Sequence, residues 1–188
     1  VSVAPMKLNQ PSGQKPDARV GATLTRATAN TALLFGGVSV QSQDTLGDSF
    51  ILTQGADKMY SWQLVEDPAN APTPRTGHTA AANKGKIYIF GGAKKNGDVV
   101  DDAGAVFEYT VGTKKWTKLS AANSAENLPS AREKMSSFFL NDEMYIVGGC
   151  NRDACEKDMW KFTPTTSTWS KVVLDAQLNW TPRIKNGQ

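Results

Sequence analysis

Cysteine, histidine and long apolar runs are all scarce in this chain, and each shortage excludes a class of protein. Two cysteines among 188 residues are too few for a scaffold built on disulfides, and one histidine is too few for a metal centre that needs several. No apolar run approaches the ~20 residues of a membrane-spanning helix. The net charge of +3 is small and spread along the chain, so we expect neither a nucleic acid nor a membrane as a partner. The cysteine content, with no signal-peptide pattern in the first residues, predicts a reducing compartment, cytoplasmic or nuclear.

Three kinds of residue recur in step along the sequence. Gly-Gly pairs are spaced 55 and 57 residues apart, three of the tryptophans 54 and 53 apart, and four arginines 56, 57 and 51 apart. Each of the first three arginines precedes its Gly-Gly pair by 16 or 17 residues, so the series share one phase. A fixed period of this length predicts an array of similar structural units.

Each unit contains short runs of residues that favour strands. Residues 87–90 and 144–147 are short runs rich in β-branched and aromatic residues that follow Asn-, Asp- or Gly-containing turns, and 106–109 and 159–162 read as a further strand. A second turn then leads to a strand that carries the Trp. No stretch of twelve residues has a helical period, so each unit is predicted to be four antiparallel strands, the size of a propeller blade.

The combination of an Arg, a Gly-Gly pair, an aromatic residue and a Trp in one unit resembles the kelch repeat, whose period is about 50 residues. The second unit carries Arg75, Gly91, Gly92, Tyr109 and Trp116, and the third carries Arg132, Gly148, Gly149, Phe162 and Trp169. The first unit keeps Arg19, Gly36, Gly37 and Trp62, but Leu52 replaces the aromatic. We assign structural roles to all of them: the glycines let the chain turn and let an aromatic ring lie against bare backbone, and the aromatics fill the wedge between blades.

The resemblance implies an all-β fold, a partial kelch-type β-propeller of about three four-stranded antiparallel blades plus the start of a fourth. The expected repeats are 19–74, 75–131 and 132–182, with 183–188 beginning the next blade and 1–18 a possible outer strand of an adjacent or closing blade. Propellers have four to eight blades. We therefore expect the remaining blades to come from the same, longer chain or from another subunit.

The longest connections, those within a blade between its second and third strands and those between blades, fall on one face. Recognition residues concentrate on loops held by a rigid scaffold, and the resemblance implies that this face docks partner peptides. The candidate protein-partner residues in these loops are Lys94, Lys95, Asp98, Asp101, Asp102, Arg152, Asp153 and Glu156.

Evidence for catalysis in the sequence is weak. His78 is expected to be structural, and Cys150 and Cys155 are expected to be free thiols, with a local disulfide as the alternative. Asp101 and Asp102 form an acidic pair, but nothing supplies a buried environment or a nucleophile. No hydrolase, P-loop or dinucleotide motif occurs. We therefore expect no catalytic residue, no metal and no cofactor.

Two functions from different classes remain. The first is a non-catalytic scaffold that binds a partner protein through its long loops. The second is the targeting or regulatory propeller of a larger enzyme, as in the kelch-containing serine/threonine phosphatases that this pattern resembles. A sugar-active propeller enzyme is a weaker alternative.

Overall fold

The strand-forming runs of the sequence fold into three four-stranded antiparallel sheets and one two-stranded sheet. The structure, a computed structural model, describes residues 15–66 and 69–173. Blade A consists of β2 (Thr23–Arg26), β3 (Thr31–Phe35), β5 (Ser49–Gln54) and β6 (Tyr60–Leu64). Blade B consists of β7 (Thr79–Asn83), β8 (Lys86–Phe90), β9 (Val106–Thr110) and β10 (Lys115–Leu119). Blade C consists of β11 (Ser136–Leu140), β12 (Glu143–Val147), β13 (Met159–Thr163) and β14 (Thr168–Lys171).

Two-residue turns join the first two strands of blades B and C, as the sequence predicts. In blade B, Asn83 pairs with Lys86 across Lys84 and Gly85, both of which have positive φ. In blade C the turn residues Asn141 and Asp142 also have positive φ. Tight hairpins need this backbone conformation, which Gly and Asn adopt most readily.

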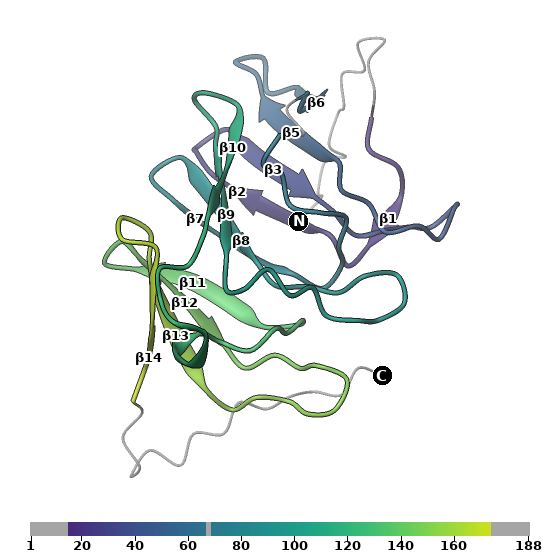
Figure 1. The fold of residues 1–188 in the computed structure, drawn as a ribbon. Coiled ribbons are helices and arrows are strands. Elements are labelled where there is room, and N and C mark those ends of the chain that lie inside the picture. Colours follow the sequence, from purple (N-terminus) through teal and green to yellow (C-terminus); the bar gives the residue numbers. More distant parts are fainter. Residues whose placement is uncertain (1–14, 67–68, 174–188) are drawn as a thin grey trace, which may run out of the picture.

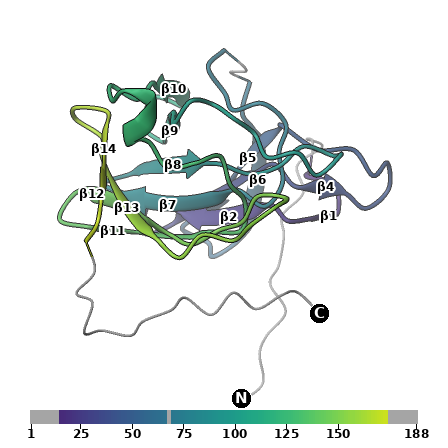
Figure 2. The same ribbon diagram turned by 60° about the horizontal axis from the view of Figure 1, so that its bottom comes forward.

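The blades are arranged side by side around an axis that runs past their first strands. Strand β7 contacts β2 on one side and β11 on the other, whereas β6, β10 and β14 form the outer edges of the sheets (Figure 1). The short strands β1 (Arg19–Val20) and β4 (Val38–Ser39) pair separately beside blade A. One turn of 3-10 helix, η1 (Ala125–Asn127), is the only helical element in the described part, and it lies against β14 (Figure 2).

The core lies in two layers between the blades. The layer between blades A and B contains Leu33, Phe35, Ile51, Ile87, Ile89, Phe107, Tyr109 and Trp116. The layer between blades B and C contains Ala81, Tyr88, Phe90, Val106, Met135, Met144, Ile146, Trp160, Phe162 and Trp169. The all-β prediction of an open, partial propeller is therefore confirmed. The predicted start of a fourth blade at 183–188, and residues 1–14 of the predicted outer strand, lie outside the described residues.

None of the helical structure within the described ranges has the length and hydropathy of a membrane-spanning helix.

Candidate interaction face

Each repeat arginine clamps the base of a long loop. Arg75 is fully buried; its Nη1 donates to the carbonyl of Gly91 at 3.1 Å and to Oδ2 of Asp102 at 2.7 Å. Its guanidinium carbon also lies 5.1 Å from the centre of the Phe107 ring. The loop between β8 and β9 thus has both ends tied to one side chain, so Arg75 sets its position.

The same clamp recurs in the other blades. Arg132 donates to Gly148 O at 3.0 Å and pairs with Asp158, and Arg19 does the same with Gly36 O and Asp48. Burial raises the pKa of Asp158, but hydrogen bonds from Arg132 and from Trp160 Nε1 outweigh burial, so this pKa lies below its ordinary value. From the sequence, Asp48 and Asp158 have no predicted role, and Asp102 is predicted to bind a partner rather than Arg75. An Asp 26 to 29 residues after each Arg is the signal that identifies them.

The Gly-Gly pairs make room for the next blade rather than for an aromatic ring alone. A Cβ on Gly36 would lie 2.6 Å from the carbonyl oxygen of Arg75 and 3.0 Å from the His78 ring. The following glycine, Gly37, donates its N–H to the same Arg75 carbonyl at 2.9 Å. In the next repeat, Gly92 N–H donates to Arg132 O, also at 2.9 Å. The glycines therefore fix how consecutive blades dock.

The repeat tryptophans fill the wedge on the side of the preceding blade. Trp116 of blade B lies 5.5 Å from Phe35 of blade A, and Trp169 of blade C lies 4.9 Å from Phe90 of blade B, measured between ring centroids. Trp62 is opposite Leu52 in the register of β5 and β6. Both side chains therefore lie on the same face of the sheet, the side of blade A that faces away from blade B. The Trp62 ring contacts Phe50 at 6.4 Å and is only partly buried.

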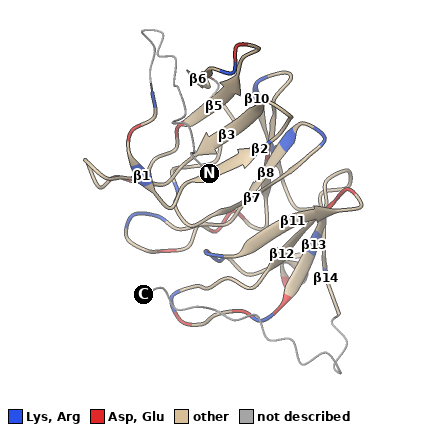
Figure 3. Cartoon of the chain, turned by 180° about the vertical axis from the view of Figure 1, so that it is seen from behind, with Lys and Arg blue, Asp and Glu red and all other residues tan. Residues whose placement is uncertain are grey.

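The three long loops follow one another along one edge of the molecule (Figure 1). These loops, 36–48, 91–105 and 148–158, are named here the long-loop rim. Lys95 Nζ lies 2.7 Å from Asp44 Oδ1 and links the first loop to the second. Arg152 Nη2 lies 3.0 Å from Asp98 Oδ1 and links the second to the third. Figure 3 shows the charged residues that follow one another along these loops.

Three of the predicted partner-binding residues are therefore drawn together in the rim. Lys95, Asp98 and Arg152 join neighbouring loops, and Arg152 also donates to the carbonyl of Asn96 at 2.6 Å. The hydrogen bond from Lys95 lowers the pKa of Asp44 below its ordinary value. The rim is thus cross-linked on its surface by exposed ion pairs.

The other five predicted residues have different positions. Asp102 pairs with the buried Arg75, so the structure places its carboxylate in the clamp. Asp101 accepts a hydrogen bond from the N–H of Ala103, and Glu156 accepts one from Ser130 Oγ. The remaining two, Lys94 and Asp153, are exposed in the loops between β8 and β9 and between β12 and β13.

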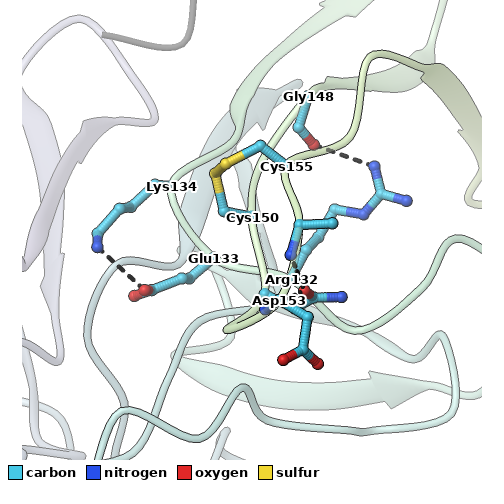
Figure 4. Close-up of a disulfide and its surroundings, with 9 residues drawn as sticks. Arg132, Glu133, Lys134, Gly148, Cys150, Asp153 and Cys155 are labelled. Carbon is cyan, nitrogen blue, oxygen red and sulfur yellow. Dashed lines mark hydrogen bonds and ion pairs between the residues drawn. A yellow bond between two sulfur atoms is a disulfide. The ribbon is translucent and has the colours of Figure 1, made fainter. Parts of the chain in front are cut away.

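The expectation of free thiols is wrong: Cys150 and Cys155 form a disulfide (Figure 4). The two residues face each other across a short hairpin as a bridged antiparallel pair, with Cα atoms 4.0 Å apart. Ala93 and Val99 occupy the same paired positions in blade B. The spacing of two cysteines cannot reveal this register, because it depends on the hairpin that brings them together.

The single histidine is an interblade residue. His78 Nε2 lies 2.8 Å from Thr23 Oγ1 of blade A, and its ring is edge-on to Phe35 at 5.2 Å. Burial, with a smaller contribution from the charge of Arg75, lowers the pKa of His78 to about 3. The ring is therefore neutral at physiological pH. Within residues 15–66 and 69–173, no group of three or more His, Cys, Asp or Glu side chains could hold a metal ion.

Comparison with known proteins supports one family. The profile of the KLHDC2/KLHL20/DRC7 Kelch-repeats domain matches residues 4–184. The chain is 26% identical over 180 residues to Tip elongation aberrant protein 3 of Schizosaccharomyces pombe, covering 82% of this chain and 16% of that protein. It is 28% identical over 170 residues to Kelch domain-containing protein 3 of Bos taurus, covering 86% and 42%. It is 31% identical over 101 residues to the Rab9 effector protein with kelch motifs of Xenopus laevis, covering 53% and 26%.

The chain thus spans less than half the length of each of these relatives. The match nevertheless extends over almost all of its own residues, and the repeated Arg, Gly-Gly and Trp contacts recur in the fold that the family profile implies. The chain belongs to the kelch-repeat family.

Proposed function

We propose that this protein is a non-catalytic scaffold that binds a partner protein through the long-loop rim. The observation that carries the proposal is the cross-linking of adjacent loops by the Lys95–Asp44 and Arg152–Asp98 ion pairs. Loops joined in this way present one surface instead of three independent ones. A rigid scaffold that carries such loops is the usual arrangement of a recognition site.

Two further observations support the proposal. The buried arginine clamps fix the bases of the loops, so exposed residues such as Lys94 and Asp153 are presented from a defined position. Kelch-repeat proteins generally mediate protein–protein interactions, and one relative is named an effector of Rab9.

Affinity purification of the full-length protein followed by mass spectrometry tests this face. A variant with Ala at four rim positions should lose the partners of the wild type: Lys94, Lys95, Arg152 and Asp153. A control with Ala at four exposed positions outside the rim should keep them: Lys58, Lys84, Lys171 and Asp57. Recovery of the same partners with the rim variant would contradict the proposal.

We also propose that further blades, from the same chain or another subunit, cover the outer sides of blades A and C. On blade C, Phe138 and Leu140 are 43% and 54% exposed, and on blade A, Leu24 is 55% exposed. Large apolar residues gathered on a sheet favour a covering partner. Mass measurement of the complete gene product and of its assemblies tests this; a stable three-blade monomer would overturn it.

A role as the regulatory module of a larger protein is a second candidate. The region matched in Tip elongation aberrant protein 3 is 16% of that protein, which supports kelch repeats as one segment among others. The full reading frame decides between the two, since a catalytic domain next to the repeats favours the regulatory role and its absence favours the plain scaffold.

For the compartment, we retain cytoplasm or nucleus as the proposal, on the low cysteine content. The disulfide between Cys150 and Cys155 argues against it, because such bonds persist mainly in oxidising compartments. Alkylation of thiols in acid-quenched cells tests the proposal: two modified cysteines support a reducing compartment, and a protected pair overturns it.

A further inference from the structure

The three loops of the long-loop rim share one hairpin at their tips. In each, the residue after the Gly-Gly pair faces a residue further along the loop as a bridged antiparallel pair: Val38 with Thr45, Ala93 with Val99, and Cys150 with Cys155. The residue that follows the pair donates its N–H to the second glycine of the blade: Leu46 to Gly37 at 2.8 Å, Val100 to Gly92 at 2.7 Å, and Glu156 to Gly149 at 2.8 Å. Because the backbone is the same, the three hairpins can be compared residue by residue.

Blade C differs from the other two blades in what anchors this hairpin. The residue after the bridged pair is the apolar Leu46 in blade A and Val100 in blade B, and Val100 is only 6% exposed. In blade C this position is the half-buried Glu156, whose carboxylate accepts a hydrogen bond from the exposed Ser130. Removing an apolar side chain from water stabilises the structure around it, and a carboxylate makes no such contribution. In blade C the disulfide therefore takes the place of the apolar anchor.

The disulfide joins a fixed arm of the hairpin to an exposed one. Cys150 exchanges two backbone hydrogen bonds of 2.8 Å with Glu133, next to the arginine clamp of blade C (Figure 4). Cys150 is half-buried, whereas Cys155, in the returning arm, is exposed. A small thiol can thus reach the bond from the Cys155 side. Opening the bond leaves Cys150 in place and releases the returning arm.

The turn between the two cysteines carries the link to the second rim loop. Asn151 holds the turn, since its Oδ1 accepts the N–H groups of Asp153 at 2.9 Å and Ala154 at 2.8 Å. From this turn, Arg152 Nη2 reaches Asn96 O at 2.6 Å and Asp98 Oδ1 at 3.0 Å. The contact between the second and third loops therefore starts from the turn whose two arms the disulfide joins.

We propose that Cys150 and Cys155 form a redox clasp of the long-loop rim, an inference that rests on the proposed function of that rim. The closed disulfide holds residues 151–154 where Arg152 reaches Asp98. In the dithiol form the returning arm opens, the Arg152 link breaks with it, and the rim binds its partner more weakly. Exposed disulfides are the labile and regulatory ones. In a reducing compartment the dithiol is the resting form, so an oxidant strengthens binding.

The two forms interconvert by thiol chemistry in which atoms and electrons balance. A glutathione thiolate attacks Cys155 Sγ, the S–S bond breaks, and Cys150 leaves as a thiolate that takes up a proton. A second glutathione thiolate then displaces Cys155 and leaves as oxidised glutathione, so the glutathione is oxidised and the protein reduced. In the other direction, hydrogen peroxide oxidises one cysteine to a sulfenic acid and releases water, and the other cysteine displaces the remaining oxygen as a second water.

Amide hydrogen exchange of the full-length protein, followed by NMR, tests the clasp without any partner. The reporters are the N–H groups of Asn151 and Glu156, which donate across the hairpin to Ala154 O at 2.9 Å and Gly149 O at 2.8 Å. Reduction with dithiothreitol should speed their exchange by about tenfold or more, because local opening exposes them, whereas Val100 N–H of blade B should not change.

The double variant Cys150→Ala with Cys155→Val, which copies the Ala93–Val99 pair, is the matched control. Its hairpin should exchange at one rate with and without the reductant. A response of this variant equal to that of the wild type would show that dithiothreitol acts elsewhere and would overturn the proposal.

Glu156→Val tests why this hairpin needs the disulfide. The substitution supplies the apolar residue that blade B has at Val100, so the reduced variant should exchange about threefold or more slower than the reduced wild type. Ser130→Ala removes the same hydrogen bond to Glu156 without adding an apolar group, and it should not slow the exchange. Equal rates for reduced Glu156→Val and the reduced wild type would contradict the anchoring argument.

The partner measurement uses those proteins that the four-Ala rim variant loses. Their recovery with the wild type should fall about threefold or more on reduction, because a loop that must be ordered on binding costs affinity, and it should stay constant with the double variant. Unchanged exchange on reduction, or unchanged recovery of these partners, overturns the proposal. If the rim variant loses no partner, the proposed function fails, and the exchange rates still decide whether the hairpin is a clasp.

Discussion

The two interfaces between consecutive blades share their backbone contacts and differ in their side chains. In both, the second glycine of the Gly-Gly pair donates to the next arginine carbonyl at 2.9 Å. His78 lies against the first glycine of blade A, whereas Met135 lies against the first glycine of blade B. The glycines and the main chain thus set how one blade packs against the next, and the side chain that completes the interface differs between the two interfaces.

A second difference concerns charge. Blade B pairs Lys86 on β8 with Glu108 on β9, and blade C pairs Glu143 on β12 with Lys161 on β13 at the corresponding register. The fold therefore accepts either orientation of the ion pair here, and blade A has the uncharged Thr31 and Ile51 at the same two positions. Because the acidic and basic residues change places between the two strands, the repeat is harder to see in the sequence, although the strand pairing is the same.

The largest expected effect concerns the arginine clamp, which all three blades share. Arg75→Ala should lower the free energy of unfolding by about 3–5 kcal/mol, because the Asp102 carboxylate and the Gly91 carbonyl lose their donor. Arg19→Ala should cost less, since the side chain of Asp48 is 32% exposed and that of Asp102 only 16%. Urea denaturation measures both, and the exposed Arg26→Ala is the control, with an expected change below about 0.5 kcal/mol. A loss under about 1 kcal/mol for Arg75→Ala would contradict the clamp.

The disulfide distinguishes the hairpin of blade C from that of blade B. Cys150→Ala with Cys155→Val gives blade C the pair that blade B has at Ala93 and Val99. Loss of the cross-link should lower the free energy of unfolding by about 2 kcal/mol relative to the oxidised wild type. The same denaturation series under reducing conditions is the check: the double variant should not respond to the reductant, and an equal response of both proteins would argue against the bond.

The interblade histidine makes the interface between blades A and B sensitive to pH. The pKa of His78 is about 3 in the folded protein and about 6.5 when unfolded, so the unfolded state binds more protons between these values. The stabilisation is complete above pH 6.5 and is lost as the pH falls toward 3. His78→Met, which copies Met135, should remove about 2 kcal/mol of the stability change between pH 7 and pH 5. Parallel pH profiles of the wild type and the variant would refute this assignment.

The two wedge tryptophans differ in one hydrogen bond. Trp169→Phe should cost about 1–2 kcal/mol more than Trp116→Phe, because only Trp169 donates to a buried carbonyl, that of Gly104. The two substitutions remove similar ring area against Phe90 and Phe35, so each serves as the control for the other. Thermal or urea unfolding provides the measurement; equal losses would show that the hydrogen bond contributes nothing.

The periodic residues made the fold predictable, and the unrepeated ones did not. Arg75 acts through a clamp that recurs in all three blades, and Gly36 and Trp116 act at an interblade interface that recurs between blades B and C, so their spacing in the sequence reflects the architecture. The cysteine pair depends on the register of one hairpin, which has no repeating signal in the sequence and becomes visible only when blade C is compared with blade B.

The smallest expected effect concerns one position where the backbone is equivalent and the residue is not. Gly21, Gly77 and Lys134 each stand two residues after a repeat arginine, with φ of 68°, 64° and 60°. In both interfaces the N–H here donates to the carbonyl of the preceding blade, from Gly77 to Gly21 and from Lys134 to Gly77.

Lysine adopts this left-handed conformation at a cost that glycine avoids. The Lys134 side chain is 71% exposed and, among the described residues, pairs only with Glu133, so Lys134→Gly removes little packing. We expect it to raise the free energy of unfolding by about 1 kcal/mol, against a loss of similar size for Lys157→Gly, an exposed lysine without positive φ. Gly77→Ala should destabilise in turn, since its Cβ would lie 2.7 Å from Glu133 Oε2. If Lys134→Gly and Lys157→Gly shift the urea midpoint in the same direction, the backbone at the start of blade C is not the one that the other two blades share.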